Sequence, residues 1–118
     1  MPPRRLFKHA LNSYTWNAKR RLPKSALLRE NRYGRAVYHL FVIRAVQRDR
    51  LCASLRKAGV ETLMHYPLPV HKQKAFRGRA GHLPEAEKFA RQILSLPLYP
   101  ELSRRDAAHI ATLLWRYA

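Results

Sequence analysis

Three titratable side chains lie on one short, proline-containing segment of the chain. His65, Tyr66 and His71 belong to the sequence His-Tyr-Pro-Leu-Pro-Val-His. Pro67 and Pro69 fix the backbone φ angle and carry no N–H donor, so a strand that reaches them must end there. Polar groups on a rigid, irregular segment beside a packed scaffold are typical of binding and catalytic sites. Two interpretations stay open on these residues alone: contact with a substrate, or packing where a strand meets a loop.

The sequence offers no complete catalytic or metal-binding set around this segment. A metal site needs three or four ligands, and His65 and His71 are separated by two prolines with no acid between them. The single cysteine, Cys52, excludes an intrachain disulfide and a cysteine cluster, and its helical spacing predicts a small buried side chain. No serine has the nucleophile-elbow context, the acids are scattered, and the four glycines match no phosphate-binding loop. We therefore expect no catalytic residue and no metal ligand in this chain.

The elements that must position the segment are predicted from residue 36 onward. Hydrophobic periodicity, turn residues and capping signals indicate an α+β domain, with a small sheet backed by helices. The first half of the predicted domain is a strand over Val37–Ile43, a helix over Arg48–Ala58 closed by Gly59, and a strand over Val60–Met64. A single turn within Lys72–Phe76 follows, and then a helix begun by Pro84 with its apolar face at Ala86, Phe89, Ala90 and Ile93. The last elements are a strand over Leu94–Leu96 and a helix over Arg104–Arg116, which is capped by Ser103.

Length and charge limit the partners. A chain of 118 residues has room for one compact domain, and its net charge of +17 is concentrated in residues 1–35, which hold ten Lys/Arg against the single acid Glu30. With Tyr14 and Trp16, this basic and poorly patterned segment could grip single-stranded nucleic acid. The alternative, a solvated basic tail without a dedicated partner, is favoured because no nucleic-acid motif occurs. No membrane-spanning run and no secretory signal are found, so we expect a cytoplasmic protein.

Several short motifs follow one another along the chain between residues 36 and 116. They are Tyr38-His39-Leu40-Phe41-Val42-Ile43-Arg44, Arg48-Asp49-Arg50-Leu51, Leu55 with Gly59, the segment from His65 to His71, Ala75-Phe76, Leu83-Pro84 with Ala86-Glu87, Leu94 through Leu102, and the closing helix. Together they resemble the C-terminal domain of the DegT/DnrJ/StrS sugar aminotransferases. The resemblance divides the chain into a segment of residues 1–35 and an aminotransferase-like small domain of residues 36–118.

The resemblance implies a fold and an activity. The fold is the small C-terminal domain of the aspartate-aminotransferase fold, with a mostly antiparallel sheet. The activity is pyridoxal-phosphate-dependent transfer of an amino group, usually from glutamate, to a keto-sugar linked to a nucleotide. In the family the Schiff-base lysine, the acidic partner of the pyridinium nitrogen and the phosphate cup lie in a large N-terminal domain. That domain is missing from this chain, so no cofactor binding and no catalysis are expected of the chain alone. His65, Tyr66 and His71 match positions near the family's substrate entrance.

Three hypotheses follow. In the first, the chain is the C-terminal part of a sugar aminotransferase from a truncated or wrongly started gene, with residues 1–35 as out-of-frame or non-native sequence. In the second, it is a stand-alone module that binds a nucleotide-sugar, forms a homodimer or pairs with a full-length aminotransferase subunit. In the third, which we disfavour, residues 4–35 bind nucleic acid. We adopt the first hypothesis.

Overall fold

The computed structural model describes residues 37–76, 78–79 and 81–117, together with residues 12, 20, 22, 26, 27 and 32–34. In this part of the chain the elements follow the order β1 (Phe41–Arg44), α2 (Arg48–Lys57), the 3₁₀ turns η2 (Val70–Lys72) and η3 (Lys74–Phe76), α3 (Pro84–Gln92), β2 (Ile93–Leu96) and α4 (Arg104–Tyr117). The predicted α+β class is confirmed. The predicted segment of residues 1–35 lies largely outside the described residues, and its boundary stays a prediction.

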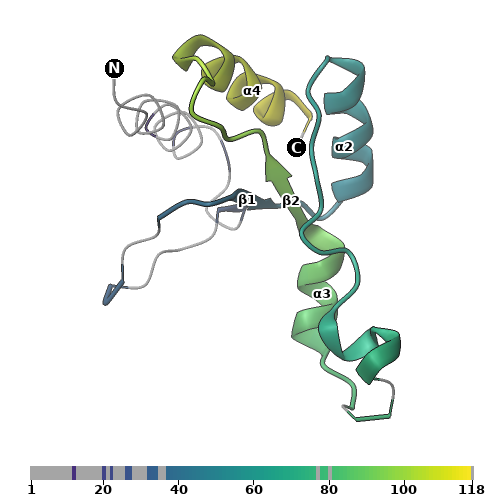
Figure 1. Ribbon diagram of the computed structural model, residues 1–118. Helices are drawn as coiled ribbons and strands as arrows, with labels where there is room; N and C mark the ends of the chain where they lie inside the picture. The colour runs from purple at the N-terminus through teal and green to yellow at the C-terminus, as the bar shows by residue number, and fades with distance from the viewer. Residues whose placement is uncertain are drawn as a thin grey trace.

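The sheet consists of two antiparallel strands. Phe41 of β1 pairs with Leu96 of β2, and Ile43 pairs with Leu94. Figure 1 shows α2 and α4 together on one side of this sheet, with α3 extending away from it in the opposite direction. The hydrophobic core lies where β1, β2, α2 and α4 meet, and its largest fully buried side chains are Ile43, Leu51, Leu55, Leu94 and Leu114. Burial of these side chains is the main force that holds the small domain together.

The helices begin where their sequence signals predict, but α3 ends at Gln92, so Ile93, predicted on its apolar face, is instead the first residue of β2. Helix α2 is followed by Gly59 at φ +81°, a left-handed conformation that favours glycine. Helix α3 begins at Pro84, and its missing N–H costs no hydrogen bond at that position. Ahead of α4, the Ser103 hydroxyl accepts a 3.0 Å hydrogen bond from the Asp106 backbone N–H and donates one of 2.6 Å to the Asp106 carboxylate. This is the predicted cap of the last helix.

The first predicted strand is longer than the observed one. The prediction covered Val37–Ile43, whereas β1 covers only Phe41–Arg44; Val37 is 87% exposed and Tyr38 has a positive φ of 52°. The reason lies in the partner strand. Strand β2 is limited to four residues, because α3 ends directly before it and Pro97, which has no N–H, follows it. Because the ladder with β2 has only four residues, β2 offers no partner to Val37–Leu40.

The second predicted strand, Val60–Met64, is wrong as a strand. Only Leu63 pairs, through two backbone hydrogen bonds to Ser95 of 2.7 and 3.1 Å. The Val60 N–H is already used, because it donates to the Leu55 carbonyl at the end of α2. The segment therefore touches β2 at a single residue and then continues into the His-Tyr-Pro sequence.

Candidate functional site

His65 and Tyr66 follow the single-residue bridge that joins Leu63 to Ser95 of β2. His65 Nδ1 is 2.9 Å from the hydroxyl of Ser95, a buried residue in the middle of β2. The Tyr66 ring stands edge-on to the His65 ring, with 5.6 Å between centroids and 85° between planes, and Tyr66 is 72% exposed. The peptide bond between the two residues is cis. His65 is thus fastened to the sheet, whereas Tyr66 faces outward.

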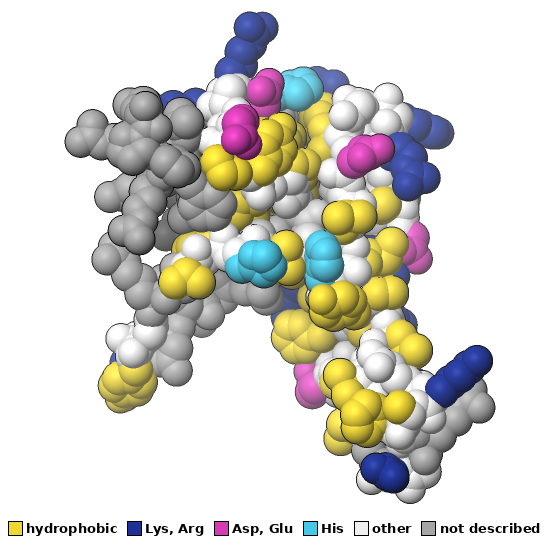
Figure 2. Space-filling view, viewed as in Figure 1, with side chains coloured by type: hydrophobic (Ala, Val, Ile, Leu, Met, Phe, Trp, Pro, Cys, Tyr) yellow, Lys and Arg dark blue, Asp and Glu magenta, His cyan; other side chains and the backbone are white. Residues whose placement is uncertain are grey.

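A hollow of about 560 Å³ separates the His-Tyr-Pro segment from α3, and we call it the apolar groove. Tyr66 and His71 both line it, and His65 is not among its lining residues. Most of the other lining residues are apolar: Leu68, Pro69, Val70, Phe76, Leu83, Ala86, Phe89, Ala90 and Ile93. Figure 2 shows the hydrophobic side chains gathered on the arm that η2, η3 and α3 form below the body of the domain. Two of the three predicted site residues, Tyr66 and His71, therefore line one groove. The third, His65, contacts the Tyr66 ring and Ser95 instead.

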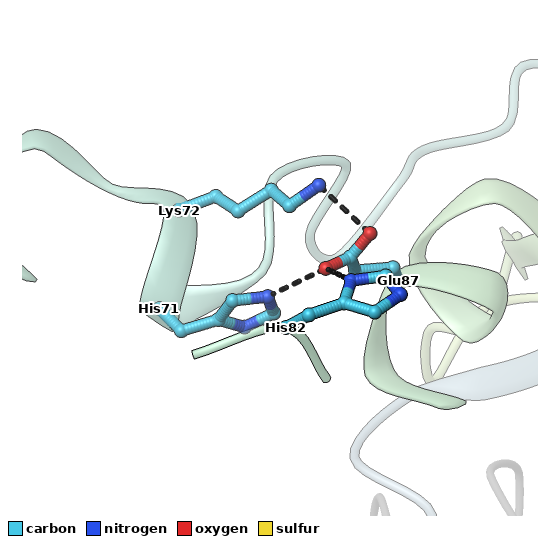
Figure 3. Close-up of polar contacts among 4 residues, drawn as sticks. All are labelled: His71, Lys72, His82 and Glu87. Carbon is cyan, nitrogen blue, oxygen red and sulfur yellow. Dashed lines mark hydrogen bonds and ion pairs between the residues drawn. The ribbon is translucent and has the colours of Figure 1, made fainter. Parts of the chain in front are cut away.

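A charged cluster fastens the segment to α3. His71 Nε2 lies 3.2 Å and His82 Nδ1 2.9 Å from Glu87 Oε1, and Lys72 Nζ lies 2.8 Å from Glu87 Oε2. Figure 3 shows the side chains of His71, Lys72 and His82 converging on the carboxylate of Glu87. The side chains of Glu87 and His71 are only 7% and 8% exposed. We call this set the Glu87 cluster.

The cluster keeps Glu87 ionised. The hydrogen bond from Lys72, followed by those from His71 and His82, lowers the pKa of Glu87 from 4.5 to about 2, although burial acts in the opposite direction. An ionised carboxylate only accepts hydrogen bonds, so both imidazoles must present an N–H to it. His71 is therefore held with Nε2 protonated, which fixes the orientation of its ring at the wall of the groove.

Glu87 is not among the site residues predicted from the sequence, where it stands only within the motif Ala86-Glu87. A signal for it was present. Glu87 precedes the buried Ala90 of the same helix by three residues, so the acid lies at core-facing spacing. A buried carboxylate needs cationic partners, and His71, Lys72 and His82 supply them.

The described residues do not fit pyridoxal phosphate. A site for this cofactor needs a lysine for the Schiff base and a carboxylate for the pyridinium nitrogen. The apolar groove is lined by neither group. A cavity beside β1 is lined by Lys88 but by no described acid. A third cavity is lined by Glu61 and Asp106 but by no described lysine. Lys72 is committed to Glu87. Within the described residues no group of three or more His, Cys, Asp or Glu side chains is arranged so that it could hold a metal ion, and no helix is long and apolar enough to cross a membrane.

The sequence profile of the DegT/DnrJ/EryC1/StrS aminotransferase family matches residues 7–114. The chain belongs to this family. The match begins well before residue 36, where the motifs first suggested it, and most of the basic N-terminal segment is included. The hypothesis that residues 1–35 are out-of-frame or non-native sequence is therefore wrong.

Individual family members show how much of a whole protein the chain represents. It is 49% identical over 77 residues to the dTDP-3-amino-3,4,6-trideoxy-alpha-D-glucose transaminase of Streptomyces venezuelae, covering 63% of this chain and 20% of that protein. It is 38% identical over 114 residues to the erythromycin biosynthesis sensory transduction protein EryC1 of Saccharopolyspora erythraea, covering 84% of this chain and 31% of that protein. The chain thus spans less than a third of these relatives.

The structural comparison agrees. The crystal structure of S. venezuelae DesV in complex with a ketimine intermediate superposes with a TM-score of 0.84 at 37% identity, over 98% of this chain and 31% of DesV. An aminotransferase from Brucella abortus gives a TM-score of 0.76 at 27% identity. The family and the small-domain fold are thereby confirmed.

Proposed function

We propose that this chain supplies the small-domain portion of a pyridoxal-phosphate-dependent sugar aminotransferase, and that the chain alone does not catalyse the reaction. The full reaction would transfer an amino group from an amino donor such as glutamate to a keto-sugar linked to a nucleotide. The observation that carries the proposal is the family match over residues 7–114 in a chain that spans 20–31% of its relatives. No described cavity is lined by both a lysine and a carboxylate, and this supports the proposal that the chain alone does not catalyse the reaction.

Within this function, we propose that Tyr66 and His71 contact the substrate at the rim of the active site and that His65 positions Tyr66. Tyr66 is exposed on the groove wall and makes no hydrogen bond to a described residue, so its hydroxyl is available to a ligand. The Glu87 cluster orients His71 beside it. Because His65 is tied to Ser95 and packs against the Tyr66 ring, its contribution is orientation rather than direct contact.

A chimera tests this proposal. The region of the S. venezuelae transaminase that matches this chain is replaced by residues 7–114, and transamination of that enzyme's own sugar substrate is measured. We expect activity, with Tyr66→Phe raising KM because the variant lacks only the hydroxyl. Tyr99→Phe, which removes an exposed hydroxyl outside the apolar groove, is the matched control. Cofactor absorbance and size-exclusion chromatography establish that each chimera is folded. A folded, cofactor-loaded chimera without activity, or equal effects of the two tyrosine variants, would contradict the proposal.

The arm suggests the partner for this function, an aminotransferase polypeptide that carries the cofactor domain. Five large apolar side chains on the arm are between 41% and 72% exposed: Tyr66, Leu68, Val70, Phe76 and Leu83. A contiguous apolar surface of this kind usually meets another protein surface. Size-exclusion chromatography with and without a full-length family member measures the pairing. We expect co-elution that Val70→Lys abolishes, and separate elution of the two proteins would contradict this partner.

A further inference from the structure

A second cavity, of about 620 Å³, lies on the other side of α3 from the apolar groove, and we call it the cationic cavity. Lys88 and Gln92, four residues apart on α3, line it, whereas Ala86, Phe89 and Ile93 line the groove. Its remaining walls come from the end of β1, the start of α2 and the end of α4. Its floor is apolar and is formed by Leu22, Ala26, Ile43 and Leu51, all of them buried.

Four cationic side chains line this cavity, each from a different element. They are Arg44 of β1, Arg50 of α2, Lys88 of α3 and Arg116 of α4. No acid is found among the described residues that line it. On the neighbouring helices, Asp49 accepts a 2.6 Å bond from Arg48, Glu87 belongs to its own cluster and Asp106 accepts a bond from Ser103, whereas Glu85 is exposed and does not line the cavity. Four like charges around one cavity raise its positive potential, and an anion would relieve their repulsion.

Arg44 gives the site a rigid component. Its Nη2 donates a 2.8 Å hydrogen bond to Gln92 Oε1, and its guanidinium carbon lies 4.4 Å from the centre of the Phe89 ring. Its Nε is buried and has no hydrogen-bond partner in the described structure. A buried donor without a partner is costly, and it is the kind of group that a bound acceptor satisfies. Arg44 is therefore held in place before any ligand arrives, which reduces the entropic cost of binding.

We propose that the cationic cavity binds a small organic phosphate. The four cations would hold the phosphate oxygens, for which guanidinium and ammonium groups are the usual protein ligands. The apolar floor and Tyr117, which also lines the cavity, would pack against the organic part. The site lies apart from the groove, and the proposal does not depend on transamination.

Isothermal titration calorimetry of the full chain with phenyl phosphate tests the proposal, with inorganic phosphate as the second probe. We expect one phenyl phosphate per chain, bound more tightly than inorganic phosphate because of the apolar floor. Arg50→Gln, Lys88→Gln and Arg116→Gln each remove one exposed lining charge. We expect each to weaken phenyl phosphate binding by about tenfold or more, the loss typical of one charge-assisted contact.

Each variant has a control on the same helix. Arg56→Gln on α2, Arg91→Gln on α3 and Arg105→Gln on α4 remove an equal charge from exposed residues that do not line the cavity. The controls should retain wild-type affinity, and thermal unfolding verifies that all six variants are folded. Equal losses in lining and control variants would show attraction to the general positive charge, and would overturn the site. Absence of binding, or equal affinity for the two probes, would overturn it as well.

Discussion

Substitution of Glu87 should remove most of the pH dependence that the Glu87 cluster gives to the free energy of unfolding in acid. In the folded protein its pKa is about 2, against 4.5 for an unperturbed glutamate. The unfolded chain therefore takes up a proton at this residue before the folded protein does. The stabilisation is complete above about pH 4.5 and is lost as the pH falls toward 2. In Glu87→Gln there is no carboxyl group to titrate, and this part of the pH dependence should disappear.

The size of the effect follows from the two pKa values. Near pH 3.3, between them, the folded carboxyl is almost fully ionised and the unfolded one almost fully protonated. Unfolding should then bind about 0.9 proton at Glu87 alone. The slope of unfolding free energy against pH reports the number of protons taken up. Near pH 3.3 this number should fall by about 0.9 from wild type to Glu87→Gln, and toward pH 2 and pH 4.5 the difference should shrink to about 0.5.

Urea unfolding followed by far-ultraviolet circular dichroism, at a series of pH values from 2 to 6, measures the slope. Glu85→Gln is the matched control, because Glu85 is an exposed acid in the same first turn of α3 and takes no part in the cluster. The control should retain the wild-type slope. Identical slopes for wild type and Glu87→Gln, or an equal loss in Glu85→Gln, would refute the role of the cluster.

Three further predictions concern the scaffold, and urea unfolding at neutral pH measures all of them. Leu114→Ala removes a side chain that is fully buried in α4 and should destabilise the domain by about 2–5 kcal/mol; a cost near zero would contradict the described core. Gly59→Ala should cost about 1–2 kcal/mol through its φ of +81° alone, since the space around it is open, and Gly81→Ala, which has no positive φ, should cost less. Ser103→Ala should lower the free energy of unfolding by about 1 kcal/mol, because the Asp106 N–H loses its hydrogen-bond acceptor. An unchanged free energy of unfolding would mean that the cap contributes nothing.

Local signals predicted the helices of this domain well. Pro84, Gly59 and Ser103 mark helix boundaries through backbone geometry or a single hydrogen bond, and these causes act within a few residues of the sequence. The strands were harder to predict, because a strand's length depends on its partner. Val37 to Leu40 have the composition of a strand, but β2 offers only four residues to pair. Nothing in the sequence near Val37 reports that limit.

The sequence predicts His65, Tyr66 and His71 as site residues, and that role stays a prediction; it does not predict how these side chains are arranged. The prolines of the His-Tyr-Pro segment correctly indicated an irregular, ordered region. Its attachment to α3 was missed, because His71 and Glu87 are sixteen residues apart and meet only in three dimensions. The cationic cavity was beyond sequence reasoning for the same reason. Arg44, Arg50, Lys88 and Arg116 come from four separate elements, and their spacing in the chain carries no periodic signal.

The most direct test of the central claim is the absorbance spectrum of this chain after addition of one equivalent of pyridoxal phosphate. An internal aldimine formed with an active-site lysine absorbs at about 420 nm. A full-length family member is the positive control, and borohydride reduction followed by peptide mapping locates any lysine that reacts. The account predicts the spectrum of free cofactor, with no stoichiometric band for this chain. A band that saturates at one cofactor per chain and maps to a single lysine would contradict it.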